Sequence, residues 1–405
     1  MRSNRPEGVA QSVEAPPLHV VRVSGRAVAR LKAGHVWVYR SDVAAVDGIE
    51  PGALVAVTDQ RGRQLGTALY STSSQIAIRM IAPGPVPDLP ALVRERLRAA
   101  VAYREGRVQD ADAYRLVFSE ADFLPGLIVD RYNDVLAMQV HTQAMDGEAV
   151  RTAIVRELSE LLHPAGMVER VDPRVRELEQ LPARESGLLY GAKSSTQFSM
   201  NGVRFFFDAQ GGQKTGAYLD QRENYRVAAE YAHGTALDVF CYQGGFALHL
   251  ARSAAKVTGV DSSRPALEVA EKNALLNQRE IEWIEANAFD LLRDYSAAGM
   301  RYDTIVLDPP AFAKTKSSLN TALRGYKELN LRALKMLRPG GFLLTCSCSY
   351  HVSEEDFLGT VVAAALDAHR TIRLVEKRGQ SRDHPILPSV PETAYLKCLV
   401  INITY

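Results

Sequence analysis

A chain of 405 residues, 46% of them hydrophobic, is long enough to form several domains with packed cores. Its formal net charge of +1 excludes any argument from total charge for a nucleic-acid or membrane partner. The four cysteines form no Cys-x-x-Cys pair, and no apolar run reaches the length of a membrane span. These features predict a cytoplasmic protein with no metal site and no membrane partner.

The first domain is predicted from short apolar runs separated by turns. Residues 1–17 are polar and contain three prolines, which indicates a disordered tail and not a signal peptide. Within residues 18–83, strand-like runs at 54–57, 65–70 and 75–80 indicate a small β-barrel-like module. Eight basic and four acidic residues lie between positions 20 and 83, a surplus that is compatible with a nucleic-acid partner.

The second domain, residues 88–192, is predicted to be a small α/β unit. A linker rich in Pro and Gly over 82–87 separates it from the first domain. An Arg-rich amphipathic helix over 89–108 follows, then a hairpin formed by 127–130 and 135–140, and then a helix over 148–162.

The third domain, residues 195–405, is predicted to be an α/β domain with a doubly wound sheet. Five expected strands alternate with helices such as 264–277 and 318–336; the strands lie at 235–240, 256–261, 281–284, 302–307 and 341–346. This alternation is typical of a parallel sheet, and strands at 371–376 and 395–404 complete the chain. Ligands of such sheets bind outside the carboxyl ends of the strands.

The first three of these strands end in residues suited to a nucleoside. Gly244 and Gly245 allow close approach of a ligand to a helix start, although a plain tight turn explains them equally well. Asp261 can accept ribose hydroxyls, and Asn287 can bind an adenine edge or cap the next helix. Because no Gly-x-Gly-x-x-Gly loop is present, the set favours S-adenosylmethionine over NAD.

The fourth strand ends in the sequence Asp-Pro-Pro at residues 308–310, followed by Phe312. Two prolines stop a central strand, and an acid on a rigid turn suits a site that holds a flat ring. The motif therefore points to a methyltransferase that modifies nucleotides. Taken alone, it favours methylation of a nitrogen.

The fifth strand ends in Ser-Cys-Ser at residues 347–349. A cysteine can attack C6 of a pyrimidine, which makes C5 nucleophilic enough to accept a methyl group. A buried cysteine is more often a small hydrophobic residue, but Cys348 lies one strand from Asp308. Cys346 would share its face only if the strand stays regular.

Two other segments carry charged residues that suit a ligand. The segment 208–222 combines glycines, a Lys, an Arg and acids, so it is either a ligand-facing loop or a solvated turn. The segment 324–330 could contact phosphate or form an ordinary charged helix face.

These motifs, in this order, resemble the bacterial large-subunit ribosomal RNA methyltransferase I family. Residues 30–42 are similar to its N-terminal PUA domain, an RNA-binding fold, and residues 118–130 to its central domain. Residues 214–216, 218–222, 308–310, 347–349 and 383–385 match its catalytic domain. The resemblance covers nearly the whole chain after the tail and implies a class I, Rossmann-like, S-adenosylmethionine-dependent RNA cytosine-5 methyltransferase.

The resemblance also implies roles for individual residues. Cys348 would be the nucleophile, and Asp308 would hold the base. The cofactor-binding residues would be Asp238, Phe240, Tyr242, Gly244, Gly245, Asp261, Ser262, Asn287, Ala288, Asp308, Gly216, Asp220 and Arg222. The RNA-binding residues would be Arg30, Lys32, His35, Trp37, Arg40, Arg324 and Lys327.

Several alternatives remain at this point. The substrate would be a cytosine of 23S ribosomal RNA, and a homodimer is possible. Residues 308–310 supply no second cysteine, so His351, Glu354 or a water would have to take the C5 proton. The competing functions are methylation of a guanine nitrogen by the same fold and an RNA-binding assembly factor without turnover.

Overall fold

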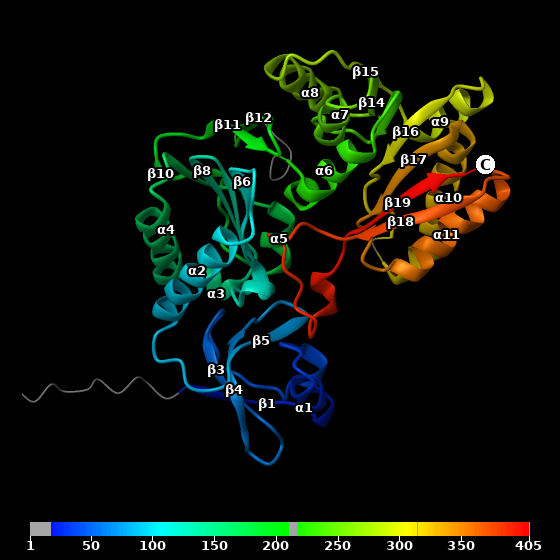
Figure 1. The fold of residues 1–405 in the computed structure, drawn as a ribbon. Helices are drawn as coiled ribbons and strands as arrows, with labels where there is room; N and C mark the ends of the chain where they lie inside the picture. Colours follow the sequence, from blue (N-terminus) through cyan, green and yellow to red (C-terminus); the bar gives the residue numbers. More distant parts are fainter. Residues whose placement is uncertain (1–17, 210–216, 314, 405) are drawn as a thin grey trace, which may run out of the picture.

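The computed structural model describes residues 18–209, 217–313 and 315–404. Three bodies follow one another along the chain (Figure 1). The predicted tail, residues 1–17, lies outside the described residues. In the described part, no helix is both long and apolar enough to cross a membrane.

The first body is a five-stranded sheet in the order β1-β3-β4-β5-β2. Ser24 begins its helix by accepting a hydrogen bond from the backbone N of Ala27 at 3.2 Å. The alternating apolar residues of β3 to β5 form its core, as their sequence pattern predicts. Its elements are β1 (His19–Arg22), α1 (Gly25–Lys32), β2 (Trp37–Tyr39), β3 (Leu54–Thr58), β4 (Gln64–Tyr70) and β5 (Ile76–Ala82).

The second body is a sheet in the order β10-β9-β8-β7-β6, with its helices packed against it. The predicted helices and hairpin are present, and the long first helix ends at Glu105, before a glycine. Its elements are α2 (Leu89–Glu105), β6 (Ala113–Phe118), β7 (Leu127–Tyr132), β8 (Val135–Val140), α3 (Gln143–Asp146), α4 (Glu148–Leu162), β9 (Gly166–Glu169), α5 (Pro173–Leu178) and β10 (Gly187–Gly191).

A two-stranded hairpin, β11 (Ser195–Met200) with β12 (Val203–Asp208), precedes the third body. The sequence analysis assigned no strands there. The hairpin alternates buried and exposed residues, and its aromatic rings pack on the second body: Phe207 stacks on Tyr132 with ring centroids 4.0 Å apart. The ring centroid of its Phe205 lies 6.1 Å from that of His249 in the third body, so the hairpin contacts both bodies.

The third body is a seven-stranded sheet in the order β15-β14-β13-β16-β17-β19-β18. Strands β13 to β17 are parallel, and β19 runs antiparallel between β17 and β18. The doubly wound α/β prediction is therefore confirmed. Its elements are α6 (Arg222–Tyr231), β13 (Thr235–Val239), α7 (Gly245–Leu250), β14 (Lys256–Asp261), α8 (Arg264–Leu276), β15 (Glu282–Glu285), α9 (Ala288–Ala297), β16 (Tyr302–Leu307), α10 (Leu319–Met336), β17 (Leu337–Ser347), α11 (Glu354–Asp367), β18 (Ile372–Arg378) and β19 (Lys397–Ile403).

The segment between β18 and β19 joins all three bodies. In Figure 1 it runs from the third body toward the first, drawn in red. Its Asp383 carboxylate accepts hydrogen bonds from Arg222 and from the backbone N of Arg115, each at 2.8 Å. Its Glu392 lies 3.8 Å from His35 of the first body. The third body is thereby tied to both of the others.

Candidate active site

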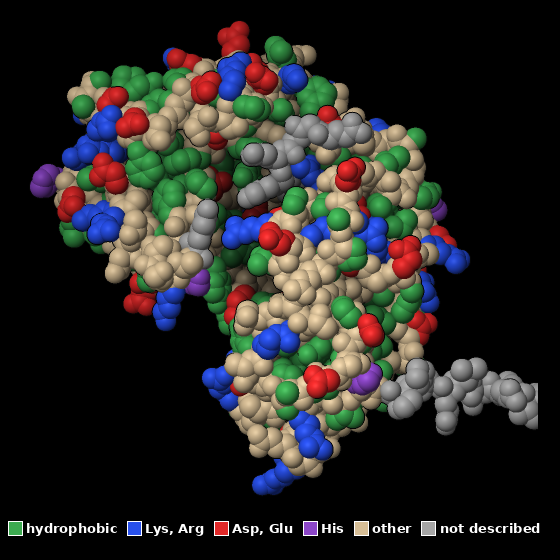
Figure 2. Space-filling view, turned by 180° about the vertical axis from the view of Figure 1, so that it is seen from behind, with side chains coloured by type: hydrophobic (Ala, Val, Ile, Leu, Met, Phe, Trp, Pro, Cys, Tyr) green, Lys and Arg blue, Asp and Glu red, His purple; other side chains and the backbone are tan. Residues whose placement is uncertain are grey.

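The candidate site lies at the carboxyl ends of β13 and β16. The chain proceeds from β13 to β14 and β15 on one side of the sheet and then returns to β16 on the other side. This reversal of direction is where α/β sheets open a crevice for ligands. Seen from behind, the surface is hollowed between the upper two bodies, with basic side chains beside the hollow (Figure 2).

The turn from β13 into α7 is strained in a way that suits a binding loop. Phe240, Tyr242 and Gly244 all have positive φ, at 68°, 50° and 86°. A Cβ on Gly244 would lie 2.9 Å from the Trp283 ring, and one on Gly245 would lie 2.6 Å from Tyr225. Both glycines are therefore required for close packing, whatever else the turn does.

Asp238, at the end of β13, supports a polar ligand in this turn. Its side chain is fully buried, and Oδ2 accepts a hydrogen bond from the backbone N of Ala247 at 2.8 Å. Its Oδ1 has no hydrogen-bond partner among the described residues. Burial raises the pKa of this carboxyl well above its usual range. An orphaned buried oxygen beside a strained loop fits a ligand with hydrogen-bond donors.

Asp261 and Asn287 end the next two strands, as predicted. The Asp261 carboxylate accepts hydrogen bonds from the backbone N of Tyr242 and from that of Ser263, both at 2.9 Å. Ser262 lies between Asp261 and Ser263 in the sequence. The Asn287 side-chain oxygen accepts hydrogen bonds from the first turn of α9, which begins at the buried Ala288. The structure therefore gives Asn287 the helix-capping role that the sequence left as an alternative.

Asp308 follows β16 and is held by a neighbouring segment. The Gln221 side-chain amide donates to its Oδ1 at 2.9 Å. Burial, followed by the charge of Asp220, raises the pKa of Asp308 to about 7. Asp220 in turn accepts a hydrogen bond from the Tyr395 hydroxyl at 2.6 Å. A carboxyl that is half neutral near pH 7 can either donate or accept a hydrogen bond.

Cys348 lies beside the same turn. Its thiol approaches the carbonyl oxygen of Pro309, with Sγ 3.8 Å from that oxygen. Burial, followed by the charges of Asp308 and Asp220, raises the pKa of the thiol to about 12. Cys346 is fully buried and pairs across the sheet with Cys398, so it lies in the core. The structure thus separates the two cysteines, and only Cys348 is partly accessible.

The sequence analysis missed two residues beside Cys348. Lys397 donates to the carbonyl oxygens of Ser349 and Tyr395 at 2.7 and 2.9 Å, and burial lowers its pKa to about 8. The Tyr218 ring lies 5.0 Å from that of Tyr242, and burial raises the pKa of its hydroxyl. Lys397 begins β19, the strand between β17 and β18, and nothing in its local sequence marked it as a site residue. Tyr218 is the first residue of the matched segment 218–222, but it was not among the expected site residues.

One expected cofactor residue, Arg222, lies away from the strand ends. The Arg222 guanidinium is buried and bound to Asp383 at 2.8 Å, so it lies in the junction between bodies and not at the strand ends. Its role in cofactor binding stays a prediction. Gly216 lies outside the described residues, together with the rest of 210–216.

The expected RNA-binding residues divide into two groups. The Arg40 guanidinium is bound to backbone carbonyls such as that of Ser74, and the Trp37 indole donates to Glu120 at 3.1 Å. Trp37 and His35 thus contact the second and third bodies, whereas the Arg40 guanidinium bonds to carbonyl oxygens of its own body. Lys32 is exposed and the Arg30 side chain is 30% exposed, although Arg30 is paired with Asp42.

The remaining two expected RNA-binding residues lie on α10. Arg324 is exposed, and its guanidinium donates to the Thr321 hydroxyl at 3.2 Å. Lys327 forms an ion pair with Asp367 at 2.8 Å. Arg324 is therefore the better placed of the two to reach a phosphate.

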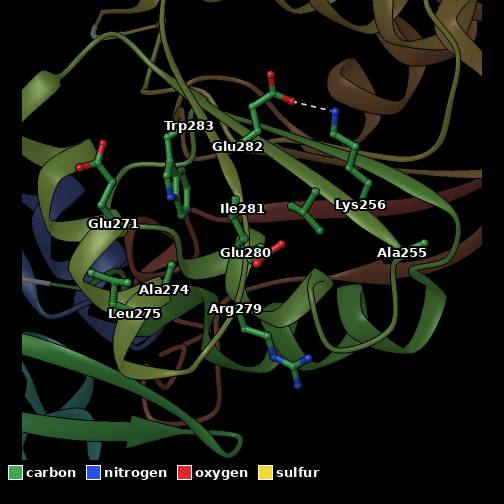
Figure 3. Close-up of a pocket in the computed structure, with 11 residues that line it drawn as sticks. Ala255, Lys256, Glu271, Ala274, Leu275, Arg279, Glu280, Ile281, Glu282 and Trp283 are labelled. Carbon is green, nitrogen blue, oxygen red and sulfur yellow. Dashed lines mark ion pairs between the residues drawn. The ribbon is translucent and has the colours of Figure 1, made fainter.

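A separate hollow of about 690 Å³ lies beside the edge strand β15 (Figure 3). Lys256 and Glu282 form an ion pair there at 3.1 Å, and Leu275 and Trp283 also line it. None of the expected site residues lines this hollow. Among the described residues there is no cluster of His, Cys, Asp or Glu suited to a metal ion.

Comparison with known proteins gives a consistent result. Residues 21–83 match a PUA-like domain family, and residues 180–402 match an S-adenosylmethionine-dependent methyltransferase family. A Tolumonas auensis protein named ribosomal RNA large subunit methyltransferase I is 41% identical over 382 residues, 91% of this chain and 95% of that protein. A Shewanella denitrificans protein of the same name is 39% identical over 92% of this chain and 96% of that protein.

Solved structures show the same fold. A crystal structure of a methyltransferase complexed with SAH superimposes with a TM-score of 0.81 at 20% identity, over 95% of this chain and all of that one. A Streptococcus mutans structure gives a TM-score of 0.80 at 19% identity, with the same coverage. The PUA-like body and the methyltransferase sheet are thus both shown, and S-adenosylmethionine is the cofactor of this fold.

Proposed function

The chain belongs to the ribosomal RNA large subunit methyltransferase I family, and from this premise we propose that it methylates C5 of a cytosine in large-subunit ribosomal RNA. The observation that carries the proposal is the position of Cys348. A partly accessible thiol lies 3.8 Å from the Pro309 carbonyl oxygen, on the turn that also presents Asp308. A nucleophile and a carboxyl at one strand-end crevice are what addition to a pyrimidine ring requires.

The turn after β13 and the ends of β14 and β15 would hold the cofactor. S-adenosylmethionine, when bound, supplies an electrophilic methyl group. Asp238 offers the unpartnered Oδ1, and the Asp261 carboxylate lies where ribose hydroxyls are accepted. Gly244 and Gly245 let this turn pack closely against Trp283 and Tyr225, which fixes the position of its backbone.

Cys348 would add to C6 of the flipped cytosine. As the S–C6 bond forms, the C5–C6 π electrons would form a C4–C5 double bond and the C4–N3 π electrons would move to N3, which takes up one proton. Because the thiol pKa is raised to about 12, its proton must leave as the S–C6 bond forms. An ionised Asp308, whose pKa is about 7, is the carboxylate suited to take that proton and pass it to N3.

After C5 is methylated, the C5 proton leaves, the C5–C6 double bond reforms, and the Cys348 sulfur departs and regains its proton from N3 through Asp308. A base must take the C5 proton. Of the candidates raised from sequence, Glu354 forms an exposed ion pair with Lys377 at 2.7 Å, which occupies it. His351 packs against the ring of Tyr350 in the loop that follows Cys348, and a water stays the other option.

The test compares Cys348→Ala with Cys346→Ala. We expect Cys348→Ala to lose methyl transfer to ribosomal RNA by several orders of magnitude, since the thiol forms the covalent bond to C6. Cys346→Ala removes a thiol that is buried in the core two residues earlier in the chain, and this variant should retain most activity. Tritiated S-adenosylmethionine with unmodified ribosomal RNA measures transfer, and nucleoside analysis identifies the product. Full transfer by Cys348→Ala would refute the covalent mechanism.

One observation favours a second function, methylation of a guanine nitrogen. The raised pKa of the Cys348 thiol disfavours a free thiolate, and nitrogen methylation needs no thiolate. This alternative predicts that both cysteine variants stay active and that the product is a methylated guanosine. An assembly factor without turnover predicts neither product, and calorimetry would detect no binding of S-adenosylmethionine.

A further inference from the structure

The two serines around Cys348 bond in a different direction from the thiol. The Ser347 and Ser349 hydroxyls contact α10 inside the protein, whereas the Cys348 thiol approaches the Pro309 carbonyl oxygen. Both serines are fully buried, whereas Cys348 is partly accessible. Each hydroxyl therefore needs a partner inside the protein.

One side chain supplies that partner to both serines. The Tyr326 hydroxyl of α10 lies 2.9 Å from the Ser349 hydroxyl and accepts a hydrogen bond from the Ser347 hydroxyl at 3.0 Å. Tyr326 is itself fully buried. The Ser349 hydroxyl also accepts a hydrogen bond from the backbone N of Ala313 at 3.1 Å, which connects the same cluster to the segment after Asp-Pro-Pro.

The Tyr326 ring makes a second contact with that segment. Its centroid lies 4.8 Å from that of Phe312, and on its other side Phe357 of α11 lies 5.3 Å away. Tyr326 thus touches both halves of the candidate site from behind: the Asp-Pro-Pro segment through Phe312 and the Ser-Cys-Ser segment through its hydroxyl.

We propose that Tyr326 is a positioning residue that holds the Cys348 thiol beside Asp308, by fixing Ser347 and Ser349 with its hydroxyl and Phe312 with its ring. This rests on the proposed role of Cys348. Tyr326 acts only through these neighbours, because the serines and the strand end separate its hydroxyl from the crevice. This role gives Ser347, Ser349 and Phe312 a common function: each is a part of the site that Tyr326 contacts and holds in place.

The test is Tyr326→Phe, which removes one oxygen and keeps the ring. Misplacement of a reacting group lowers turnover steeply, so we expect kcat to fall about 10-fold to 100-fold with the KM for S-adenosylmethionine unchanged. The thiol, no longer held against Pro309, should react with iodoacetamide several-fold faster. Cys241, Cys346 and Cys398 are buried and serve as internal controls that stay unlabelled.

Tyr231→Phe is the matched control. It also removes a tyrosine hydroxyl from a hydrogen bond, to Glu376 at 2.6 Å, far from Cys348 at the end of α6. We expect it to change neither turnover nor the labelling of Cys348. Ser349→Ala should reproduce the effect of Tyr326→Phe, and the double variant should be no worse than either single one, since both break one cluster.

Labelling of Cys348 needs neither RNA nor cofactor, which separates this inference from the proposed function. Unchanged kcat together with unchanged labelling in Tyr326→Phe would overturn the inference. Labelling of all four cysteines would also overturn it, because it would mean that Tyr326 only stabilises the core. A wild-type protein that transfers no methyl group to cytosine would refute the proposed function while leaving the labelling result interpretable.

Discussion

Asp308, which follows β16, differs from Asp303, the acid within that strand, because its neutral form is favoured. Asp303, five residues earlier, accepts hydrogen bonds from the backbone N of Thr235 and from Arg338 at 2.7 and 2.9 Å. Burial there acts to raise the pKa, but these partners lower it overall. Asp308 has a neutral amide as its partner and a second carboxylate nearby, so its pKa rises to about 7. One carboxyl within β16 and one just after it thus have pKa values shifted in opposite directions.

This contrast predicts opposite effects of two asparagine substitutions. Because the pKa of Asp308 is raised in the folded protein, the folded state binds this proton more tightly than the unfolded state does. Its contribution to the free energy of unfolding is fully present below the ordinary pKa of 3.8 and is lost as pH rises through about 7. We therefore expect Asp308→Asn to be more stable than the wild type at pH 8, by about 2–4 kcal/mol, and to match it near pH 4. Asp303→Asn should be less stable than the wild type at pH 8.

Urea unfolding at pH 4, 6 and 8 measures both variants. Methyl transfer should be lost in Asp308→Asn at every pH, because the amide exchanges no proton with the base. A stability difference for Asp308→Asn that does not change with pH would contradict the raised pKa.

At the scale of elements, the turn between β13 and α7 concentrates the backbone strain of the site. Phe240, Tyr242 and Gly244 adopt positive φ within five residues. Such strain persists only where the surroundings enforce it, and here β14 and the Trp283 ring pack directly behind the turn. The backbone of Phe240 and of Cys241 donates to the Val260 carbonyl oxygen of β14, which fixes the turn to the neighbouring strand.

Gly244→Ala tests whether this shape serves the cofactor. An alanine there has an unfavourable φ of +86° and a Cβ 2.9 Å from the Trp283 ring. We expect a loss of about 1–3 kcal/mol of stability and weaker binding of S-adenosylmethionine. The matched control is Gly359→Ala in α11, where an added Cβ meets nothing within 4 Å and should stabilise the helix slightly. Calorimetry measures cofactor binding in both; equal affinities would exclude the turn as the binding loop.

The elements of the sheet could be predicted because their signals are local. Strands such as β14 and β16 are apolar runs buried on both faces, and their predicted bounds agree with the structure. The ends of these strands then placed Asp261 and Asp308 at one edge. No strands were predicted for the β11–β12 hairpin, although its two-residue Asn201-Gly202 turn, with positive φ at both residues, is a local hairpin signal.

Residues that act through distant contacts could not be predicted. Lys397 reaches Ser349 across 48 positions of sequence, and Tyr326 reaches Ser347 across 21. Nothing in their local sequence distinguishes them from other residues of a strand or a helix. The ion pair of Arg222 could not be predicted for the same reason: its partner Asp383 lies 161 positions away.

At the scale of the whole molecule, Asp383 is the point where the second and third bodies meet. Its carboxylate binds Arg222 and the backbone N of Arg115, and its carbonyl oxygen accepts a hydrogen bond from Arg104 at 2.9 Å. Burial would raise its pKa, but His384 and Arg222 lower it well below its usual range. The carboxylate is therefore charged throughout the physiological range, and it neutralises a buried arginine.

Asp383→Ala should consequently disturb the assembly of the bodies more than any single surface change. It leaves the Arg222 guanidinium buried without its carboxylate, which costs about 3–5 kcal/mol. Because Arg222 begins α6 and Asp383 also binds the second body, we expect the linkers around residues 209 and 380 to become sensitive to protease before the methyltransferase sheet unfolds. Asp294→Ala is the control: its ion pair with Arg293 is exposed, and its loss should cost under about 0.5 kcal/mol. Urea unfolding and limited proteolysis measure both variants, and a wild-type cleavage pattern in Asp383→Ala would show that the bodies stay together without this carboxylate.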